Sequence, residues 1–251
     1  MGWFLGAGLG FMLGGPLGAV VGGALQSFMG SEARRAMGGG SAQSREEAAF
    51  VTYLTTIMTK IALADGRLDQ SERQVIHNFF AQEIGFSGLD LRFIDGLIEQ
   101  TRLVNPDMGM VARSFRSNAS REQAMLLLDV CQQIAIADGK VTVSEAKELD
   151  YLASYLGISK EEHERIKTRY QGAGRQRRAG APAAVSLDDY AVLGVSKAAS
   201  ASEVKAAYRQ MAAQYHPDKV SHLGKELIDF AGKKFIEINK AYENIKKEKG
   251  F

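Results

Sequence analysis

The sequence predicts an all-α protein in which an N-terminal transmembrane helix precedes a helical bundle and a small C-terminal helical hairpin domain. Beyond residue 47, apolar residues recur with the spacing of one helix face, first at Phe50, Tyr53, Leu54, Ile57, Met58 and Ile61. The alternation of apolar and polar residues that is typical of strands does not occur between residues 47 and 170. An uncharged apolar stretch at residues 3–28 predicts the membrane helix.

Changes in composition divide the chain into five segments. A Gly-Gly-Gly-Ser sequence at residues 38–41 indicates a flexible linker, and a Gly- and Ala-rich stretch after residue 170 indicates a second one. The predicted segments are a membrane helix (1–30), a linker (31–46), a bundle (47–170), a flexible basic linker (171–186) and a C-terminal domain (187–251).

Composition narrows the classes of function. The formal net charge is only +2, so no overall basic excess indicates a nucleic-acid partner. Cys131 is the only cysteine, which excludes an internal disulfide and any zinc module built from several cysteines. It lies in the largely apolar run 126–136, so we expect a buried core residue and not a nucleophile.

Charge predicts the orientation of the N-terminal helix. No charged side chain precedes Glu32, and Arg34 and Arg35 follow the apolar stretch. A cleaved signal peptide would begin with a positive region, which is missing here. Because positive flanks stay in the cytoplasm, we expect a single-pass helix in a lipid bilayer, with its N-terminus periplasmic and the following domains cytoplasmic.

Glycines recur at every fourth position of this stretch, and they lie on one face of a helix: Gly6, Gly10, Gly14, Gly18 and Gly22. Such a stripe lets a second helix approach closely, which predicts a homodimer. The alternative is that glycine is simply frequent in membrane helices. The regularity of the five positions favours packing.

The bundle contains an internal repeat. Residues 61–68 (IALADGRL) are echoed by residues 134–141 (IAIADGKV), and a capped helix start follows each copy. Each copy therefore predicts helix, glycine turn and helix, and two copies predict a pseudo-symmetric bundle. Pairs with capping-box spacing mark the helix starts: Asp69 with Glu72, Ser120 with Gln123, Thr142 with Glu145, and Ser159 with Glu162.

Acidic residues gather around the two turns, and two interpretations stay open. Carboxylates here could bind a divalent cation, with the candidate ligands Asp65, Asp69, Glu72, Asp138 and Glu145. Their spacing does not match an EF-hand loop, and turn and capping roles account for each of them. Caps are the favoured interpretation.

The paired Ala-Asp-Gly turns, each followed by a Ser-Glu helix start, resemble the TerB-like domain of tellurite-resistance proteins over about residues 47–170. This resemblance implies an all-helical domain. Some such domains carry an acidic metal-binding surface, which adds weight to the cation interpretation.

The C-terminal domain reads as two long helices joined by a short exposed turn. Ser200 and Glu203 have capping-box spacing and open a helix at 201–215, and a further helix covers about 225–247. Pro217 disfavours helical geometry at His216, so the first helix ends there. The tripeptide His216-Pro217-Asp218 should therefore lie at the tip of the hairpin, with Lys205 and Arg209 on the helix that leads to it.

A longer pattern surrounds this tripeptide: YAVLGV at 190–195, Tyr208-Arg209, YHPDK at 215–219, Lys234-Phe235 and AYE at 241–243. In this order and spacing it resembles the J domain of DnaJ-type co-chaperones. The resemblance implies that the domain binds a DnaK-type chaperone and stimulates its ATP hydrolysis. The residues implied in binding are His216, Pro217, Asp218, Lys205, Tyr208, Arg209 and Lys219.

Two departures from the J-domain pattern concern charge. Ala206 and Gln210 occupy positions that are often basic, so the charge that steers the partner is weaker here.

No nucleophile or third orienting group accompanies His216 and Asp218, so a catalytic pair is not expected and the chain is not predicted to be an enzyme. No cofactor is expected apart from the candidate cation.

The order of membrane helix, TerB-like bundle, linker and C-terminal J domain resembles the DjlA-like family of membrane-anchored co-chaperones. This resemblance implies location in the bacterial inner membrane and a link to envelope or capsule signalling. The alternative function is a membrane-attached metal sensor or scaffold centred on the bundle.

Overall fold

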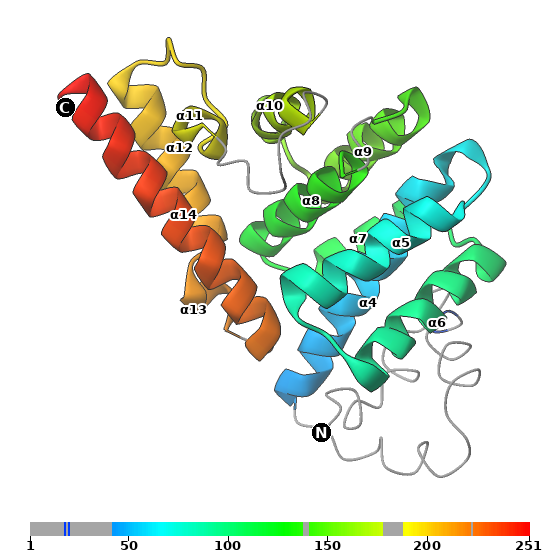
Figure 1. Cartoon of the computed structure of the whole chain (residues 1–251). Helices are drawn as coiled ribbons and strands as arrows, with labels where there is room; N and C mark the ends of the chain where they lie inside the picture. Colours follow the sequence, from blue (N-terminus) through cyan, green and yellow to red (C-terminus); the bar gives the residue numbers. More distant parts are fainter. Residues whose placement is uncertain (1–17, 19, 21–41, 138–140, 178–187, 222) are drawn as a thin grey trace.

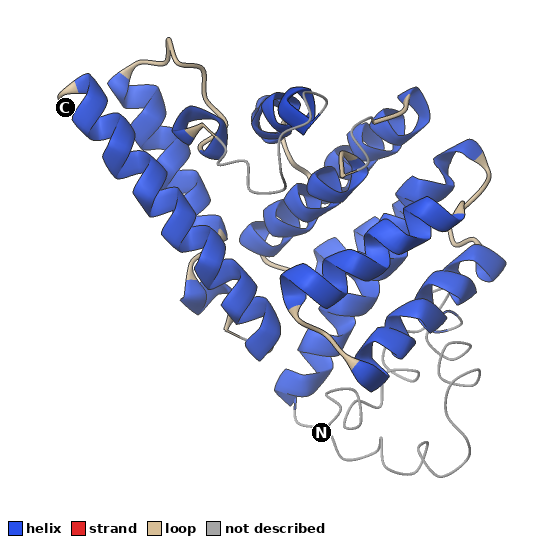
Figure 2. Ribbon diagram, in the orientation of Figure 1, coloured by secondary structure: helices blue, strands red, loops and turns tan. Residues whose placement is uncertain are grey.

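The computed structural model describes residues 18, 20, 42–137, 141–177, 188–221 and 223–251. Within these ranges every regular element is a helix and no strand is present, as Figure 2 shows. The all-α prediction is confirmed. No helix in this described part is long and apolar enough to cross a membrane.

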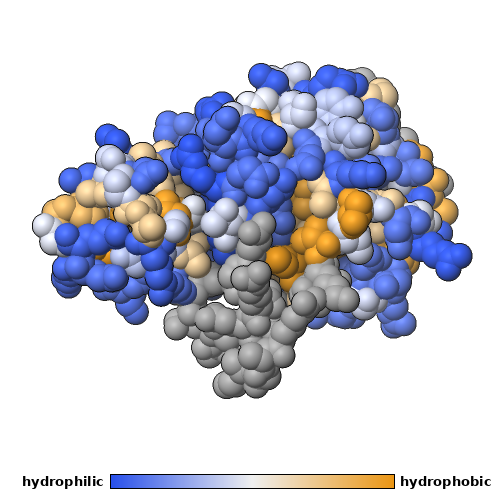
Figure 3. Space-filling model, turned by 90° about the horizontal axis from the view of Figure 1, so that it is seen from above, coloured by the Kyte–Doolittle hydropathy of each residue, from blue (hydrophilic) through white to orange (hydrophobic). Residues whose placement is uncertain are grey.

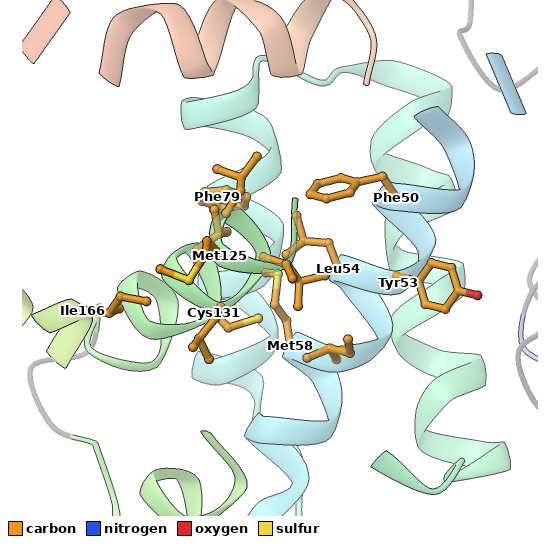
Figure 4. Packing of buried hydrophobic residues seen from close by; sticks show 14 of the residues in the cluster. Phe50, Tyr53, Leu54, Met58, Phe79, Met125, Cys131 and Ile166 are labelled. Carbon is orange, nitrogen blue, oxygen red and sulfur yellow. The ribbon is translucent and has the colours of Figure 1, made fainter. Parts of the chain in front are cut away.

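The bundle is built around α4 (Ala42–Ala62), which packs against α6 (Gly88–Val104), α7 (Met108–Asn118) and α8 (Arg121–Ala135). Figure 4 shows Leu54 and Met58 of α4 meeting Met125 and Cys131 of α8 in the core. Cys131 is 1% exposed, and burial raises the pKa of its thiol, with the negative charge of Asp129 acting in the same direction. Its predicted core position is confirmed.

Each copy of the internal repeat joins two helices into one unit, as predicted, and residues 138–140 of the second copy lie outside the described part. In the first, α4 leads through the short 3₁₀ helix η3 (Leu63–Asp65) and Gly66, at φ +91°, into α5 (Gln70–Asn78). In the second, α8 leads into α9 (Val143–Leu156). Because α4 contacts both α8 and α9, the two units pack against each other.

A helix that ends at Gly85 was predicted, but the π-helical geometry of its last part was not. The segment η4 (Phe79–Ile84) continues α5 as a π-helix and ends at Gly85, whose φ is +91°. Its wider turns bury Phe79 and Phe80 together, with ring centroids 5.4 Å apart. Capping and periodicity do not signal such a segment, since its geometry depends on what the two rings pack against.

Both predicted linkers are too long. The final bundle helix α10 (Lys160–Arg177) continues seven residues into the predicted linker 171–186, and α4 begins at Ala42 instead of near residue 47. Extending an existing helix costs little, because each added residue gains a hydrogen bond without a new nucleation step. Residues 178–187, which include Arg178, lie outside the described part.

The C-terminal domain consists of α11 (Asp189–Val192), α12 (Ala201–Gln214), α13 (Pro217–Val220) and α14 (Lys225–Lys249). The helices α12 and α14 form the predicted hairpin, and α11 packs on α14. Val204, Ala207 and Met211 of α12 are buried, as are Ile238 and Ala241 of α14. This apolar seam holds the hairpin together.

The C-terminal domain rests on the bundle. Helix α12 contacts α8, and α14 contacts η4, as the arrangement in Figure 1 makes visible. Phe79 and Phe230 meet edge to face, with centroids 5.8 Å apart, and Arg165 Nη1 donates to Gln210 Oε1 at 2.6 Å. The sequence predicted a tether between the domains but not this contact.

The face shown in Figure 3 is largely hydrophilic, with an apolar area near its centre. Large apolar side chains exposed in the described part come from α6, α7, α9 and α14: Leu89, Leu103, Val104, Met110, Val143, Tyr151 and Ile236. Exposed apolar residues spread over several helices are ordinary for a folded domain.

Candidate partner-binding site

The helix that leads to the site is fixed at both ends. At its start, the Glu203 N–H donates to Ser200 Oγ at 3.3 Å, and the Ser200 N–H donates to Glu203 Oε2 at 2.7 Å. This capping box satisfies backbone donors that the first turn leaves without partners. At the other end, the Tyr215 N–H donates to Met211 O, and Pro217 prevents the helix from continuing.

The tripeptide His216-Pro217-Asp218 forms the start of a short helix and not a simple turn. His216 is the N-cap of α13, and its Nδ1 accepts a hydrogen bond from the Asp218 N–H at 3.2 Å. The imidazole also meets the Phe235 ring edge to face, with centroids 5.6 Å apart. These two contacts hold His216 in place and leave the Asp218 side chain 88% exposed.

The predicted basic residues lie on the solvent-exposed side of α12. Lys205 and Arg209 are exposed, and the Lys205 ammonium lies 4.8 Å from the centre of the Phe251 ring. Lys219 is also exposed, one residue beyond Asp218. The exposed face thus combines an exposed carboxylate, 3.7 Å from His216 Nδ1, with three cations. This arrangement suits a partner that carries both an acidic groove and a basic residue.

Tyr208 has a structural role in this hairpin. Its ring stacks on Tyr242 of α14, with centroids 4.0 Å apart and an angle of 15°, and its hydroxyl donates to Asn239 Oδ1 at 2.9 Å. The Tyr208 ring is only partly buried, and the next residue, Arg209, is exposed. We name the exposed face formed by Lys205, Tyr208, Arg209, His216, Asp218 and Lys219 the HPD face.

The acidic residues of the bundle act as caps. Asp69 and Glu72 form a complete capping box at the start of α5, and Thr142 and Glu145 form another at the start of α9. Asp65 Oδ1 accepts from the Arg67 N–H at 3.0 Å. The predicted capping pairs Ser120 with Gln123 and Ser159 with Glu162 are formed too.

The structure brings Glu72 and Glu145 to the wall of one small cavity, of about 30 Å³, beside Cys131. Burial raises the pKa of Glu72, and repulsion from Asp69, Asp65 and Glu145 also acts upward. Among the described residues no group of three or more His, Cys, Asp or Glu side chains is arranged to hold a metal ion. Asp138 lies outside the described part, so cation binding stays a prediction.

The glycine stripe falls almost wholly outside the described part, which includes none of Gly6, Gly10, Gly14 and Gly22. Gly18 is described, and it is helical and partly buried. The membrane helix and the homodimer therefore stay predictions.

Sequence reasoning missed one buried polar group close to the site. Asp129 of α8, Arg169 of α10 and Tyr215 of α12 meet in the interface between bundle and hairpin. The only signal in the sequence is a carboxylate inside the apolar run 126–136, since its partners lie 40 and 86 residues further along the chain.

Comparison with known proteins adds independent support to both domains. The family model described as "Tellurite resistance protein TerB" matches residues 51–168, and the "DnaJ domain" model matches residues 188–250. The chain thus carries the two domains in the expected order. No solved structure matches the chain.

Curated relatives that are named Co-chaperone protein DjlA match most of the chain. The protein from Photobacterium profundum is 30% identical over 231 residues, covering 85% of this chain and 83% of that protein. The protein from Escherichia coli O157:H7 is 27% identical over 233 residues, covering 86% of each. The protein from Shewanella oneidensis is 24% identical over 216 residues, covering 84% of this chain and 82% of that protein. The chain belongs to the DjlA family of co-chaperones.

Proposed function

We propose that this co-chaperone acts on its DnaK partner through the HPD face. The observation that carries the proposal is the Asp218 carboxylate, which is 88% exposed at the start of α13, in the hairpin whose helix α12 carries the exposed cations Lys205 and Arg209. An exposed carboxylate can form a charge-assisted hydrogen bond with an arginine of the partner. The chaperone, and not this chain, carries out the ATP hydrolysis.

The hairpin supports a division of roles within this face. His216 caps α13 through the Asp218 N–H, so it sets the direction of the carboxylate and need not contact the partner through Nδ1. Lys205 and Arg209 are exposed and steer an acidic groove toward the face. Removing His216 should therefore disturb the geometry of α13, whereas removing Lys205 should weaken the electrostatic attraction that brings DnaK to the face.

Binding to ATP-bound DnaK, measured at low and at physiological ionic strength, tests these roles. Replacing Lys205 or Arg209 by Ala should raise Kd about 5-fold each, since one exposed contact charge contributes roughly 1 kcal/mol. The loss should shrink as salt rises, because exposed charges are screened.

The matched control is Lys147→Ala, which removes an exposed lysine of α9 in the bundle and should leave Kd unchanged. If Lys147→Ala weakened binding as much as the α12 variants do, net charge alone would explain the effect. That result would contradict the role of the HPD face.

We also propose that residues 3–28 anchor the chain in the inner membrane and pair it with a second copy. The support is the uncharged stretch before Glu32, the cations Arg34 and Arg35 after it, and the regular glycines within it. Such an anchor would place recruitment of DnaK at the cell envelope, where a role in envelope or capsule signalling fits. Alkaline extraction should leave the chain in the membrane pellet, and release into the supernatant would contradict the anchor.

A further inference from the structure

A buried ionic group joins the bundle to the J domain. Asp129 of α8 is fully buried, at 0% exposed, and its two oxygens have donors from different domains. Arg169 Nη1 of α10 donates to Oδ1 at 2.6 Å, and the hydroxyl of Tyr215 donates to Oδ2. Since a buried carboxylate is unfavourable without partners, the hydroxyl from the J domain adds a donor to those that the bundle supplies from Arg169 and Tyr170.

Arg169 reaches the J domain as well. Its Nη2 lies 3.0 Å from the Met211 sulfur of α12, and its guanidinium lies 5.8 Å from the centre of the Tyr170 ring. Burial opposes its charge, but the Asp129 carboxylate together with Tyr170 and Tyr215 outweighs burial and raises the pKa of Arg169. The guanidinium therefore stays charged and keeps Asp129 paired.

The hydroxyl of Tyr215 stays a donor throughout the physiological pH range. Burial raises its pKa well above the ordinary value, and the negative charge of Asp129 acts in the same direction. Tyr215 is 1% exposed, so water does not compete for the bond. We name the group Asp129, Arg169 and Tyr215 the interdomain clamp.

The clamp acts on the residue next to the binding site. Tyr215 closes α12 and directly precedes His216, so fixing its side chain fixes the point where α12 ends and α13 begins. Lys205, Arg209 and Asp218 stay exposed while the J domain is docked, although α13 also contacts α8.

Two further contacts show that the interface extends beyond the clamp. Gln210 of α12 accepts a hydrogen bond from Arg165 of α10, and Phe230 of α14 packs edge to face on Phe79 of η4. Helix α12 lies beside α8, as Figure 1 shows, and α14 contacts η4. The contact with Arg165 also occupies Gln210, one of the two positions where the sequence departs from the basic J-domain pattern.

We infer that the interdomain clamp docks the J domain on the bundle and that Asp129 and Arg169 are positioning residues for DnaK, acting through Tyr215. The consequence for DnaK rests on the proposed function, whereas docking itself does not. The bundle thereby holds the HPD face in one orientation. This role is separate from the binding of any ligand by the bundle itself.

The distance between the domains tests docking in the full-length chain. Spin labels at Gln74→Cys of α5 and Lys240→Cys of α14 occupy exposed positions, and the native Cys131 is buried and will not be labelled. Double electron–electron resonance should give one narrow distance distribution, and Tyr215→Phe should broaden it. The phenylalanine keeps the ring, so circular dichroism should show an unchanged helical fold.

The matched control is Tyr53→Phe, which removes a hydroxyl that bonds Ser114 Oγ at 2.7 Å within the bundle. This variant should keep the narrow distribution. A broad distribution in the unmodified chain, or a narrow one in Tyr215→Phe, would overturn docking by the clamp.

Single-turnover ATP hydrolysis by DnaK, titrated with the chain, tests positioning. If Tyr215→Phe lowers the docked population to about one third, the half-maximal concentration should rise about threefold. The maximal rate should not change, because His216 and Asp218 are intact. If Tyr215→Phe broadens the distance distribution without raising the half-maximal concentration, the positioning role is overturned. If the unmodified chain fails to stimulate DnaK while the distances behave as expected, the proposed function fails and the clamp stands.

Discussion

At the scale of single residues, the buried polar side chains have the strongest effect on the behaviour of this protein. His163 of α10 is 4% exposed, its Nδ1 lies 3.3 Å from Asp150 Oδ1, and its Nε2 has no hydrogen-bond partner. Burial lowers the pKa of His163, and the positive charge of Lys167 acts in the same direction. The folded protein therefore disfavours the protonated imidazole.

This pKa shift predicts loss of stability in mild acid. An unfolded histidine takes up a proton near pH 6.5, whereas the folded His163 does so only at lower pH, so its contribution is present above about pH 6.5 and lost as pH falls. His163→Gln should flatten the pH dependence of the free energy of unfolding, measured by urea denaturation between about pH 7 and pH 5. An unchanged slope in the variant would contradict the assignment.

Some residues could be assigned from the sequence and others could not. Cys131 was predicted to be buried because its apolar neighbours are adjacent in sequence, and it is 1% exposed. Asp129, two residues earlier, was passed over, since its partners Arg169 and Tyr215 are distant in sequence. Local pattern identifies a core position, but it does not identify the partner of a buried charge.

At the scale of elements, the helix starts were the most predictable features. The capping pairs at Asp69, Ser120, Thr142 and Ser200 all form, because a capping box involves residues only three positions apart. The π-helical segment η4 and the continuation of α10 to Arg177 were not predicted. Their geometry depends on tertiary packing and on helix propagation, which the local signals do not report.

The start of α14 predicts the effect of one substitution. Gly224, its N-cap, has φ +91° and ψ 161°, a conformation that side chains rarely adopt, and a Cβ there would lie 1.2 Å from Glu47 Oε1 of α4. Gly224→Ala should lower the free energy of unfolding by about 1–3 kcal/mol. Chemical denaturation measures this change.

Gly232 provides the matched control within the same helix. A Cβ at Gly232 would meet nothing within 4 Å, so Gly232→Ala should raise stability by about 0.5–1 kcal/mol through higher helix propensity. Changes of the same sign in the two variants would contradict the conformational argument for Gly224.

At the scale of the whole molecule, each domain was predictable but their arrangement was not. The repeat at residues 61–68 and 134–141 and the YHPDK pattern at 215–219 each predict a local fold. The interface between the two domains includes Phe79, Phe230 and Gln210. The sequence around these residues does not distinguish them from residues of the same types on other surfaces of the protein. Only the folded chain shows that the J domain is docked on the bundle with Lys205, Arg209 and Asp218 exposed.

The measurement that tests the central claim most directly is single-turnover ATP hydrolysis by DnaK with the full-length chain and with Asp218→Asn. The intact chain should accelerate hydrolysis. The variant should lose about 10- to 100-fold of the stimulation, because a hydrogen bond to a charged group contributes roughly 1.5–3 kcal/mol. No acceleration by the intact chain, or equal acceleration by Asp218→Asn, would contradict the account.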